Sequence, residues 1–266
     1  MINLKHFIIM VFITGCTGNY LTAQKKVVMI LSAAEAISLN EGEKLRQTGV
    51  FLNEFYLAYH SLKQQGYKVD FATPMAQTPN IDKESTEDKY WKDNTELKAQ
   101  AMAFITRDSA FLNPKSLKYV LEHQNHYIGL VIPGGQGLMV DLAYDKHIPE
   151  ILKQFAQDQK PTGLICHAPS LLTTIAKHEN PYKGYKVSAV SPIEEFVIER
   201  FIMKGKPEVR KIGKRLRKHG LKYRSGLPKA NFAIKDRNLV TSQNPFSSSA
   251  FSKLYKQALM EYQDRH

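Results

Sequence analysis

Short apolar runs of strand length alternate with segments of helical periodicity along most of this 266-residue chain. The runs dominated by apolar residues lie at 25–32, 67–72, 127–132 and 161–166. Helical spacing of apolar residues occurs at 48–65, 148–157 and 249–262. Parallel strands need long crossover connections, usually helices, and those helices cover both faces of the sheet. We therefore predict that residues 25–266 form one α/β domain, a parallel sheet sandwiched between helices.

The remaining segments are predicted from weaker patterns. Further helices are expected near 96–106 and 114–123, and further strands at 185–189 and 238–241. The segment 33–47 is expected to be irregular. The polar segment 73–99 interrupts the alternation, and we expect it to cover a site.

Cys166 ends one of the apolar runs and precedes a segment, 170–177, that is expected to be helical. Active sites of parallel sheets lie at the carboxyl ends of strands, so this thiol stands where a nucleophile is expected. The dipole and unpaired N–H groups of a following helix favour the thiolate, which predicts an acidic thiol. Ala168 and Pro169 fit the sharp strand-to-helix turn of a nucleophile elbow. A buried, inert cysteine is the alternative.

A catalytic thiol needs a proton acceptor, an acid that orients it and donors for an oxyanion. His167 is adjacent in sequence and is the candidate acceptor. Gly134 and Gly135 follow an apolar run and can offer backbone N–H groups. Glu54 borders the apolar face of the first predicted helix and is the candidate acid. Taken singly, each of these residues also fits an ordinary structural role, such as a cap, a tight turn or an exposed helix charge.

Residues 1–24 have the layout of an export signal. Lys5 precedes an apolar run at 7–13 that is too short to span a bilayer. Cys16 follows Ile-Thr-Gly, a pattern that resembles a bacterial lipoprotein box and predicts a membrane-anchored lipoprotein. Cleavage near residue 24 would instead give a soluble periplasmic protein, and a cytoplasmic protein is expected if this segment is not a signal. Either processing event leaves Cys166 without a disulfide partner, which favours catalysis.

The formal net charge is +12, and much of it lies between residues 204 and 229, where Glu208 is the only acid. Such a patch can attract an anionic membrane surface or nucleic acid. Apolar residues within it recur near helical spacing, at Val209, Ile212, Leu216 and Leu221. A solvated helix face is therefore favoured. No recognised nucleic-acid motif accompanies the patch, so no nucleic acid partner is expected.

Four ordered segments of the chain resemble the ThiJ/PfpI superfamily, and especially its heat-shock chaperone and glyoxalase III branch. They are TGVFLNEFYLAYHSLKQQGYKVDFATP (48–74), YIGLVIPGGQG (127–137), GLICHAPS (163–170) and LVTSQNPFSS (239–248). The resemblance extends over nearly all of residues 25–266 and implies a flavodoxin-like, class I glutamine-amidotransferase-like fold. Authentic glutamine amidotransferases of this fold carry a His-Pro-Glu sequence that is absent here, so glutamine hydrolysis is disfavoured.

The resemblance also implies roles for individual residues. Cys166 is the nucleophile, His167 is its proton-transfer partner, and Glu54 is the acid placed against the thiol. An acid downstream of the cysteine completes the triad in this branch. When the segment SAVSPIEEF (188–196) is aligned with the branch, Glu195 stands best at the position of that acid, and Glu194 is the alternative.

The resemblance assigns oxyanion and substrate binding to Gly134, Gly135, Gln136 and His167. Gln136 stands where relatives often have histidine, and Ser-Pro-Ile at 191–193 replaces the branch's usual residues before the acid. These two departures leave the substrate preference open.

The implied activity is that of a glutathione-independent glyoxalase III, a lyase of the D-lactate dehydratase type. It would convert the small 2-oxoaldehydes methylglyoxal and glyoxal to lactate and glycolate, without a metal or another cofactor. A holdase chaperone for unfolded clients is one alternative, and a cysteine peptidase or protein deglycase is another. We also expect a homodimer.

Overall fold

The computed structural model describes residues 25–92 and 94–266. The predicted export signal and the predicted lipid attachment at Cys16 lie outside the described residues. Export and anchoring therefore stay predictions, and so does dimerisation, because the structure describes a single chain. Within the part of the chain that is described, no helix has both the length and the apolar character needed to cross a membrane.

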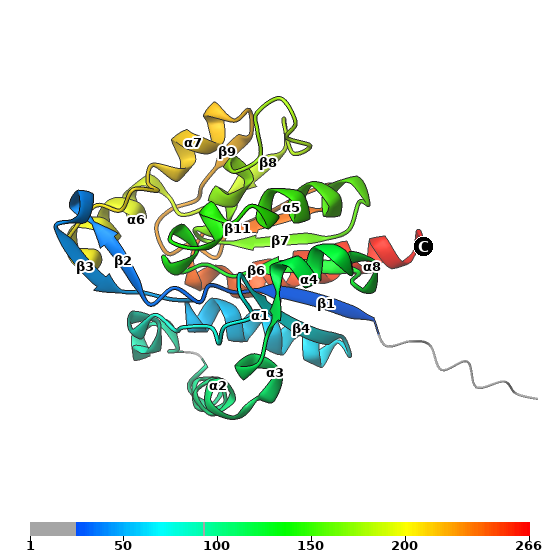
Figure 1. The fold of residues 1–266 in the computed structure, drawn as a ribbon, viewed down its shortest axis with the longest axis horizontal. Coiled ribbons are helices and arrows are strands. Elements are labelled where there is room, and N and C mark those ends of the chain that lie inside the picture. The colour runs from blue at the N-terminus through cyan, green and yellow to red at the C-terminus, as the bar shows by residue number, and fades with distance from the viewer. Residues whose placement is uncertain (1–24, 93) are drawn as a thin grey trace, which may run out of the picture.

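One seven-stranded sheet runs through the centre of the molecule, in the order β10-β11-β7-β6-β1-β4-β5 (Figure 1). Its strands are β1 (Lys26–Ile30), β4 (Lys68–Thr73), β5 (Lys115–Ser116), β6 (Gly129–Ile132), β7 (Thr162–Ile165), β10 (Ala233–Asp236) and β11 (Leu239–Ser242). All neighbours pair in parallel except β10 and β11, which are antiparallel. The four apolar runs all form strands of this sheet, so the prediction of an α/β fold with a parallel sheet is confirmed.

Two pairs of helices cover the two faces of the sheet (Figure 1). The first pair is α4 (Leu117–Glu122) with α5 (His147–Gln157), and the second is α1 (Leu52–Gln64) with α8 (Ser248–Gln263). Beside α1 lie α2 (Thr95–Arg107) and α3 (Ser109–Leu112). Phe55 of α1 contacts the rings of Phe104 and Phe111, with centroids 6.0 and 5.4 Å apart. This aromatic cluster joins α2 and α3 to the main core.

Two small sheets depart from the predicted pattern. The first is a hairpin of β2 (Ala36–Leu39) and β3 (Lys44–Gln47), so the expectation of irregular structure at 33–47 is wrong. Ile37 and Leu39 alternate with exposed residues, and the turn between the strands has positive φ at Asn40, Glu41 and Gly42. The second sheet pairs β8 (Lys186–Ser188) with β9 (Lys222–Arg224), so the strand expected at 185–189 lies outside the main sheet.

The helix expected at 170–177 is also wrong, since a short 3-10 helix, η7 (Ala168–Thr173), follows Cys166. Hydroxyl groups explain part of the difference. Thr173 Oγ1 donates to Ser170 O, and Thr174 Oγ1 donates to Leu171 O, each three residues back. Such side-chain bonds to the backbone compete with continuation of a helix.

The carboxyl-terminal third adds short helices that lie near the sheet's carboxyl edge. They are α6 (Pro192–Val197), the π-helix η8 (Ile198–Met203) and α7 (Ile212–Lys218). In the basic segment 204–229, Val209, Ile212, Leu216 and Leu221 are buried, as predicted, whereas Leu227 is exposed. The helical part of this segment is limited to α7. The other 3-10 turns are η1 (Asn40–Gly42), η2 (Lys83–Thr86), η3 (Asp88–Tyr90), η4 (Gln124–His126), η5 (Gly137–Met139), η6 (Leu142–Tyr144) and η9 (Pro245–Ser247).

Candidate active site

A cavity of about 500 Å³ lies at the carboxyl ends of the central strands. Cys166 and His167 follow β7, Gln136 follows β6, and Asn244 follows β11, and all four side chains line it. This is the edge of a parallel sheet at which ligands usually bind. The predicted nucleophile therefore faces a space that can admit a substrate.

Cys166 occupies a sharp turn with φ +58°, a conformation that non-glycine residues rarely adopt. Two backbone hydrogen bonds hold it there. Its N–H donates to Ser242 O at 2.9 Å, and its carbonyl accepts from Val190 N at 3.0 Å. Strained backbone of this kind costs on the order of 1 kcal/mol or more and persists only where the surroundings impose it. The predicted elbow between strand and helix is present.

His167 brings a ring nitrogen to the thiol. Its Nδ1 lies 3.2 Å from Cys166 Sγ, and the side chain is buried. Burial lowers the pKa of His167 to about 4, against a smaller opposing effect of the negative charge of Glu194. The imidazole is therefore neutral at neutral pH and can accept the proton of the thiol.

The thiol itself is not acidic, contrary to the expectation from sequence. Burial raises the pKa of Cys166 well above its usual value, and the charges of Glu54 and Glu194 raise it further. The backbone N–H of His167 acts in the opposite direction but more weakly. A six-residue 3-10 helix offers only a small dipole to counter the burial. Deprotonation of this thiol thus depends on transfer of its proton to a neighbour.

Glu54 lies in the first turn of α1 and is completely buried. Its Oε2 accepts a hydrogen bond of 2.9 Å from Gly134 N, while Gly134 O accepts one of 3.0 Å from Phe51 N. The Gly134 peptide therefore fixes the start of the helix and its carboxyl group together. Burial raises the pKa of Glu54 to about 8, although the contacts with Cys166 and Gly134 act in the opposite direction. At neutral pH this carboxyl is mainly protonated and can donate a hydrogen bond.

The two glycines after β6 have different functions. A Cβ on Gly134 would collide with Glu54 Oε2 and would lie 2.8 Å from Cys166 Cβ. The sequence predicts that Gly134 stabilises an oxyanion. Its N–H is already bonded to Glu54 Oε2, so it is not free to do so. Gly135 has φ +107°, and its N–H has no acceptor among the described residues. It is thus the better oxyanion donor.

The structure brings Glu194 to the cavity but not Glu195. Glu194 lines the cavity, and its charge acts on the pKa of both Cys166 and His167. Its two oxygens accept hydrogen bonds from the backbone N–H groups of Ser191 and Lys229, the Ser191 hydroxyl and the amides of Gln243 and Asn244, at 2.7 to 3.0 Å.

Glu195 points away from the cavity that Glu194 lines. Its Oε1 accepts from Ile212 N at 3.3 Å, and the side chain lines a separate cavity with Arg210 and Arg217. The alignment that favoured Glu195 therefore stays a prediction without geometric support, and the alternative, Glu194, fits the position of the third acid. Neighbouring residues on a helix point about 100° apart, so an error of one position reverses the assignment.

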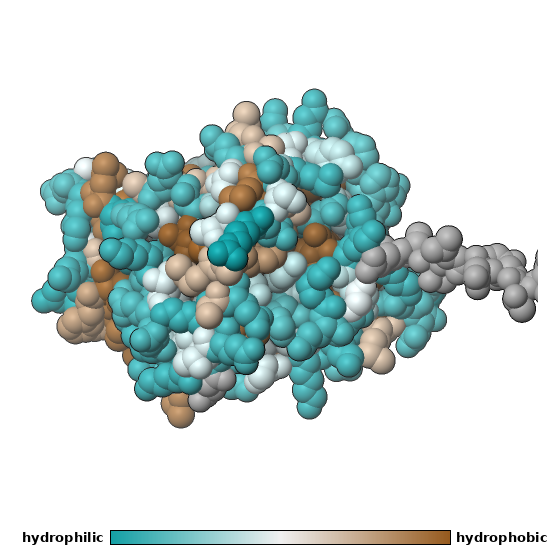
Figure 2. Space-filling view, turned by 90° about the horizontal axis from the view of Figure 1, so that it is seen from below, coloured by the Kyte–Doolittle hydropathy of each residue, from teal (hydrophilic) through white to brown (hydrophobic). Residues whose placement is uncertain are grey.

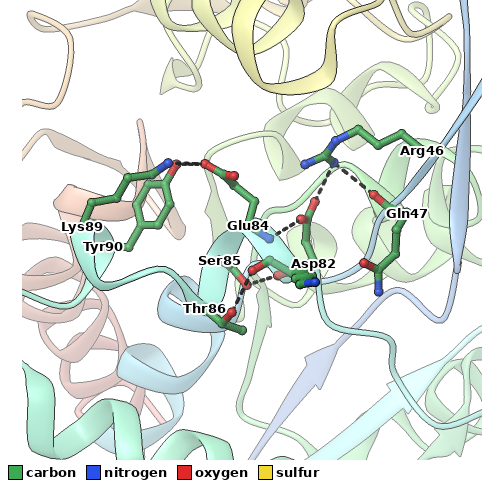
Figure 3. A network of polar contacts seen from close by, with 9 residues as sticks. Arg46, Gln47, Asp82, Glu84, Ser85, Thr86, Lys89 and Tyr90 are labelled. Atoms are coloured by element: carbon green, nitrogen blue, oxygen red, sulfur yellow. Dashed lines mark hydrogen bonds and ion pairs between the residues drawn. The ribbon is translucent and has the colours of Figure 1, made fainter.

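The polar segment predicted to cover a site forms part of the cavity wall, which confirms that expectation. Glu84, Lys89 and Tyr90, from η2 and η3, line the cavity. Figure 3 shows how they are held: Glu84 Oε1 accepts from Tyr90 Oη at 2.9 Å and from Lys89 Nζ at 2.5 Å. At the other end of the network, Asp82 pairs with Arg46 at 3.2 Å.

Sequence reasoning missed the aromatic part of this wall. The Tyr90 ring lies against Phe51 and Phe246, with centroids 4.9 and 5.9 Å away. The three residues come from segments far apart in the chain, and none follows a periodic pattern. The only available signals were the polar interruption that holds Tyr90 and the family-like segment that holds Phe246.

No group of three or more His, Cys, Asp or Glu side chains suited to holding a metal ion occurs within residues 25–92 and 94–266. The chemistry of the cavity is therefore argued from its thiol, imidazole and carboxyl groups. Together these groups can form a covalent adduct with a carbonyl carbon and move protons next to it.

Comparison with known proteins agrees with the geometry. The family model described as the DJ-1/PfpI family matches residues 45–257. The protein/nucleic acid deglycase HchA of Escherichia coli is 24% identical over 247 residues, which cover 89% of this chain and 82% of the relative. HchA of Staphylococcus aureus is 26% identical over 245 residues, with 89% and 80% coverage.

A solved structure of glyoxalase III from Candida albicans superposes with a TM-score of 0.74. It is 22% identical, and the match covers 88% of this chain and 97% of that one. At this level of identity the structural likeness establishes the fold. The match covers nearly all of both chains, which agrees with an architecture built on one central sheet.

Proposed function

The chain belongs to the DJ-1/PfpI family, and we propose that it is a cysteine-dependent glyoxalase that converts 2-oxoaldehydes to 2-hydroxy acids without glutathione. One observation carries the proposal: a buried thiol lies 3.2 Å from a neutral imidazole, and the buried carboxyl group of Glu54, bonded to Gly134 N after β6, lies against the thiol. The relatives named HchA and the Candida glyoxalase III support an aldehyde as the substrate.

The first step is addition of the thiol to the aldehyde. The Cys166 proton passes to His167 Nδ1 while Sγ bonds to the aldehyde carbon, and the carbonyl electron pair moves to oxygen. The Gly135 N–H and the protonated Glu54 carboxyl are suited to stabilise that oxygen. Proton transfer during attack removes the need for a standing thiolate, which burial of Cys166 disfavours.

The second step moves a proton from the former aldehyde carbon to the neighbouring ketone carbon. The His167 imidazolium first returns the thiol proton to the former aldehyde oxygen, which gives a neutral hemithioacetal. The imidazole then takes the proton from the first carbon and the second carbon receives a proton, while the hydroxyl proton passes from the first oxygen to the ketone oxygen. The first carbon is thereby oxidised to a thioester and the second is reduced to an alcohol. Water then attacks the thioester and releases the 2-hydroxy acid and the thiol. The net reaction adds one water to the 2-oxoaldehyde and needs no external oxidant or reductant.

Removal of aldehyde adducts from proteins is a second candidate, because the deglycase relatives share this chain's architecture. Large apolar side chains lie exposed beside the cavity, namely Ile193 and Phe196 of α6 and Phe201 of η8, each more than 60% exposed. Figure 2 shows hydrophobic surface toward the end of the molecule that carries α6 in Figure 1. Such a surface is suited to a polypeptide substrate, and it also suits the holdase alternative.

The test is to supply residues 25–266 with methylglyoxal in the absence of glutathione and to measure lactate. Cys166→Ser should reduce lactate formation to background while circular dichroism shows an intact fold. A variant with full activity would remove the thiol from the mechanism. Release of lactate from methylglyoxal-treated protein, but not from free methylglyoxal, would favour the deglycase.

A further inference from the structure

The cavity is large for the smallest 2-oxoaldehydes. Methylglyoxal carries a single methyl group beside its two carbonyls, whereas this cavity has a volume of about 500 Å³. Protein pockets of about 300–1,000 Å³ bury most of a drug-sized ligand. Much of the space around Cys166 would therefore stay unfilled with methylglyoxal bound.

The composition of the walls indicates what fills that space. Apolar side chains dominate the lining, including Val190, Ile193, Val197, Ile198, Pro245 and Phe246. The polar side chains there are mostly bonded to one another: Glu194 to Asn244 at 2.8 Å, and Glu84 to Tyr90 at 2.9 Å. Lys92 and Lys229 also line the cavity but are exposed, so few buried polar groups are left to receive a hydroxylated or charged substituent.

Outside the catalytic groups, one buried polar side chain of the lining stands apart from these pairs. Gln136 is buried and lines the cavity, and its side chain has no hydrogen-bond partner among the described residues. Its amide is suited to the carbonyl oxygens of the substrate. The Tyr90 ring contacts Phe51 edge-to-face and Phe246 in tilted geometry, and the three rings form a separate apolar region for the substituent.

Building on the function proposed above, we propose that the enzyme selects 2-oxoaldehydes with an aromatic substituent, such as phenylglyoxal, over methylglyoxal. The reaction is the same addition of one water, and it converts phenylglyoxal to mandelate. The reacting dicarbonyl group lies at Cys166 and Gln136, and the ring lies against Tyr90 and Phe246.

The experiment compares kcat/KM for the two aldehydes, measured as mandelate and lactate formed. Product formation is followed because phenylglyoxal also reacts with arginine, and Cys166→Ser supplies the background. We expect kcat/KM to be about tenfold or more higher for phenylglyoxal, since burial of additional apolar groups in a matching pocket gives discrimination of this size.

The variant Phe246→Ala should lower kcat/KM for phenylglyoxal by about tenfold while changing the value for methylglyoxal much less. Phe201→Ala is the matched control, because Phe201 is 63% exposed and lies outside the cavity lining. It should leave the ratio of the two kcat/KM values unchanged. Preference for methylglyoxal, or an equal loss with both aldehydes in Phe246→Ala, would overturn the proposal.

A binding measurement separates this proposal from the glyoxalase function itself. Mandelate should protect Cys166 from alkylation at concentrations about tenfold below those needed with lactate. Protection by mandelate without turnover of either aldehyde would reject the glyoxalase function and leave the aromatic selectivity standing. Turnover of methylglyoxal with equal protection by the two acids would reject the selectivity and keep the function.

Discussion

The base of the cavity and its walls are built in different ways. The base consists of strand ends and a helix start, where Glu54, Gly134 and Cys166 are buried and packed against one another. The walls come from 3-10 turns and from the α6–η8 segment, and several of their side chains are partly or largely exposed. Rigid elements can hold reacting groups in one geometry, while surface segments can vary without disturbing them. In the function proposed above, the base would set the reaction and the walls would set the substrate.

The largest effect short of losing the thiol is expected at the base, in His167→Asn. This change removes the only ring nitrogen near Cys166 Sγ in the described structure. General acid–base assistance is worth about a hundredfold to ten-thousandfold, so kcat/KM should fall by that amount. Because the pKa of Cys166 is raised, the residual activity should increase with pH. A pH profile of the variant, with the fold checked by circular dichroism, tests both points.

A smaller loss of activity is expected for Glu194→Gln, at a residue that lies where the base and the walls meet. Glu195→Gln is the variant with which it is compared. Glu194 accepts five hydrogen bonds, and an amide at its position would turn a donor toward groups that are themselves donors. Hydrogen bonds to charged groups are worth about 2 kcal/mol each, so the free energy of unfolding should fall by at least that amount. The activity should fall about tenfold or more.

Glu195→Gln is the matched control on the same helix. Its carboxyl accepts a long bond from Ile212 N, interacts with the backbone of Lys211, and lies outside the cavity. The cost should be below about 1 kcal/mol, with little change in kcat/KM. Denaturant unfolding and steady-state kinetics of the two variants decide between them. A greater loss of activity in Glu195→Gln would restore that residue as the third acid of the triad.

Much of the fold could be predicted because the buried strands and long helices repeat simple patterns. Strand β1 buries a continuous run of apolar residues, and helix α8 buries apolar residues at helical spacing. The hairpin of β2 and β3 was missed because its strands are only four residues long and β3 is mostly polar. Its existence depends on packing and on turn residues with positive φ, which periodicity does not reveal.

The candidate site divides in the same way. Cys166 could be identified because the end of a strand lies at a fixed place in a parallel sheet. The roles of His167 and Glu54 came from the resemblance of the surrounding segments to the family. The difference between Glu194 and Glu195 could not, since it depends on the rotation of one short helix. The pKa of Cys166 was also misjudged, because burial outweighs the helix dipole and burial is not readable from the local sequence.

The pKa of Glu54 links the base of the cavity to stability. Burial raises it from 4.5 to about 8, so between these pH values the folded chain retains a proton that the unfolded chain has released. The stabilisation associated with this proton is complete below about pH 4.5 and is lost as the pH rises towards 8. His167 acts in the opposite sense, since its pKa is lowered to about 4 and its contribution grows with pH up to its ordinary value of 6.5.

The effect most specific to the base is therefore expected in the pH dependence of Glu54→Gln. Glutamine cannot titrate, so the free energy of unfolding of this variant relative to the parent should increase with pH from about 4.5 to 8, by at most about 1.4 kcal/mol per pH unit. The contribution of His167 is common to both proteins and cancels in the difference. Urea unfolding at several pH values measures this slope, and Glu43→Gln, an exposed change, gives the baseline. A difference that stays constant across this range would show that Glu54 is ionised in the folded state and does not donate a hydrogen bond to the thiol or the substrate.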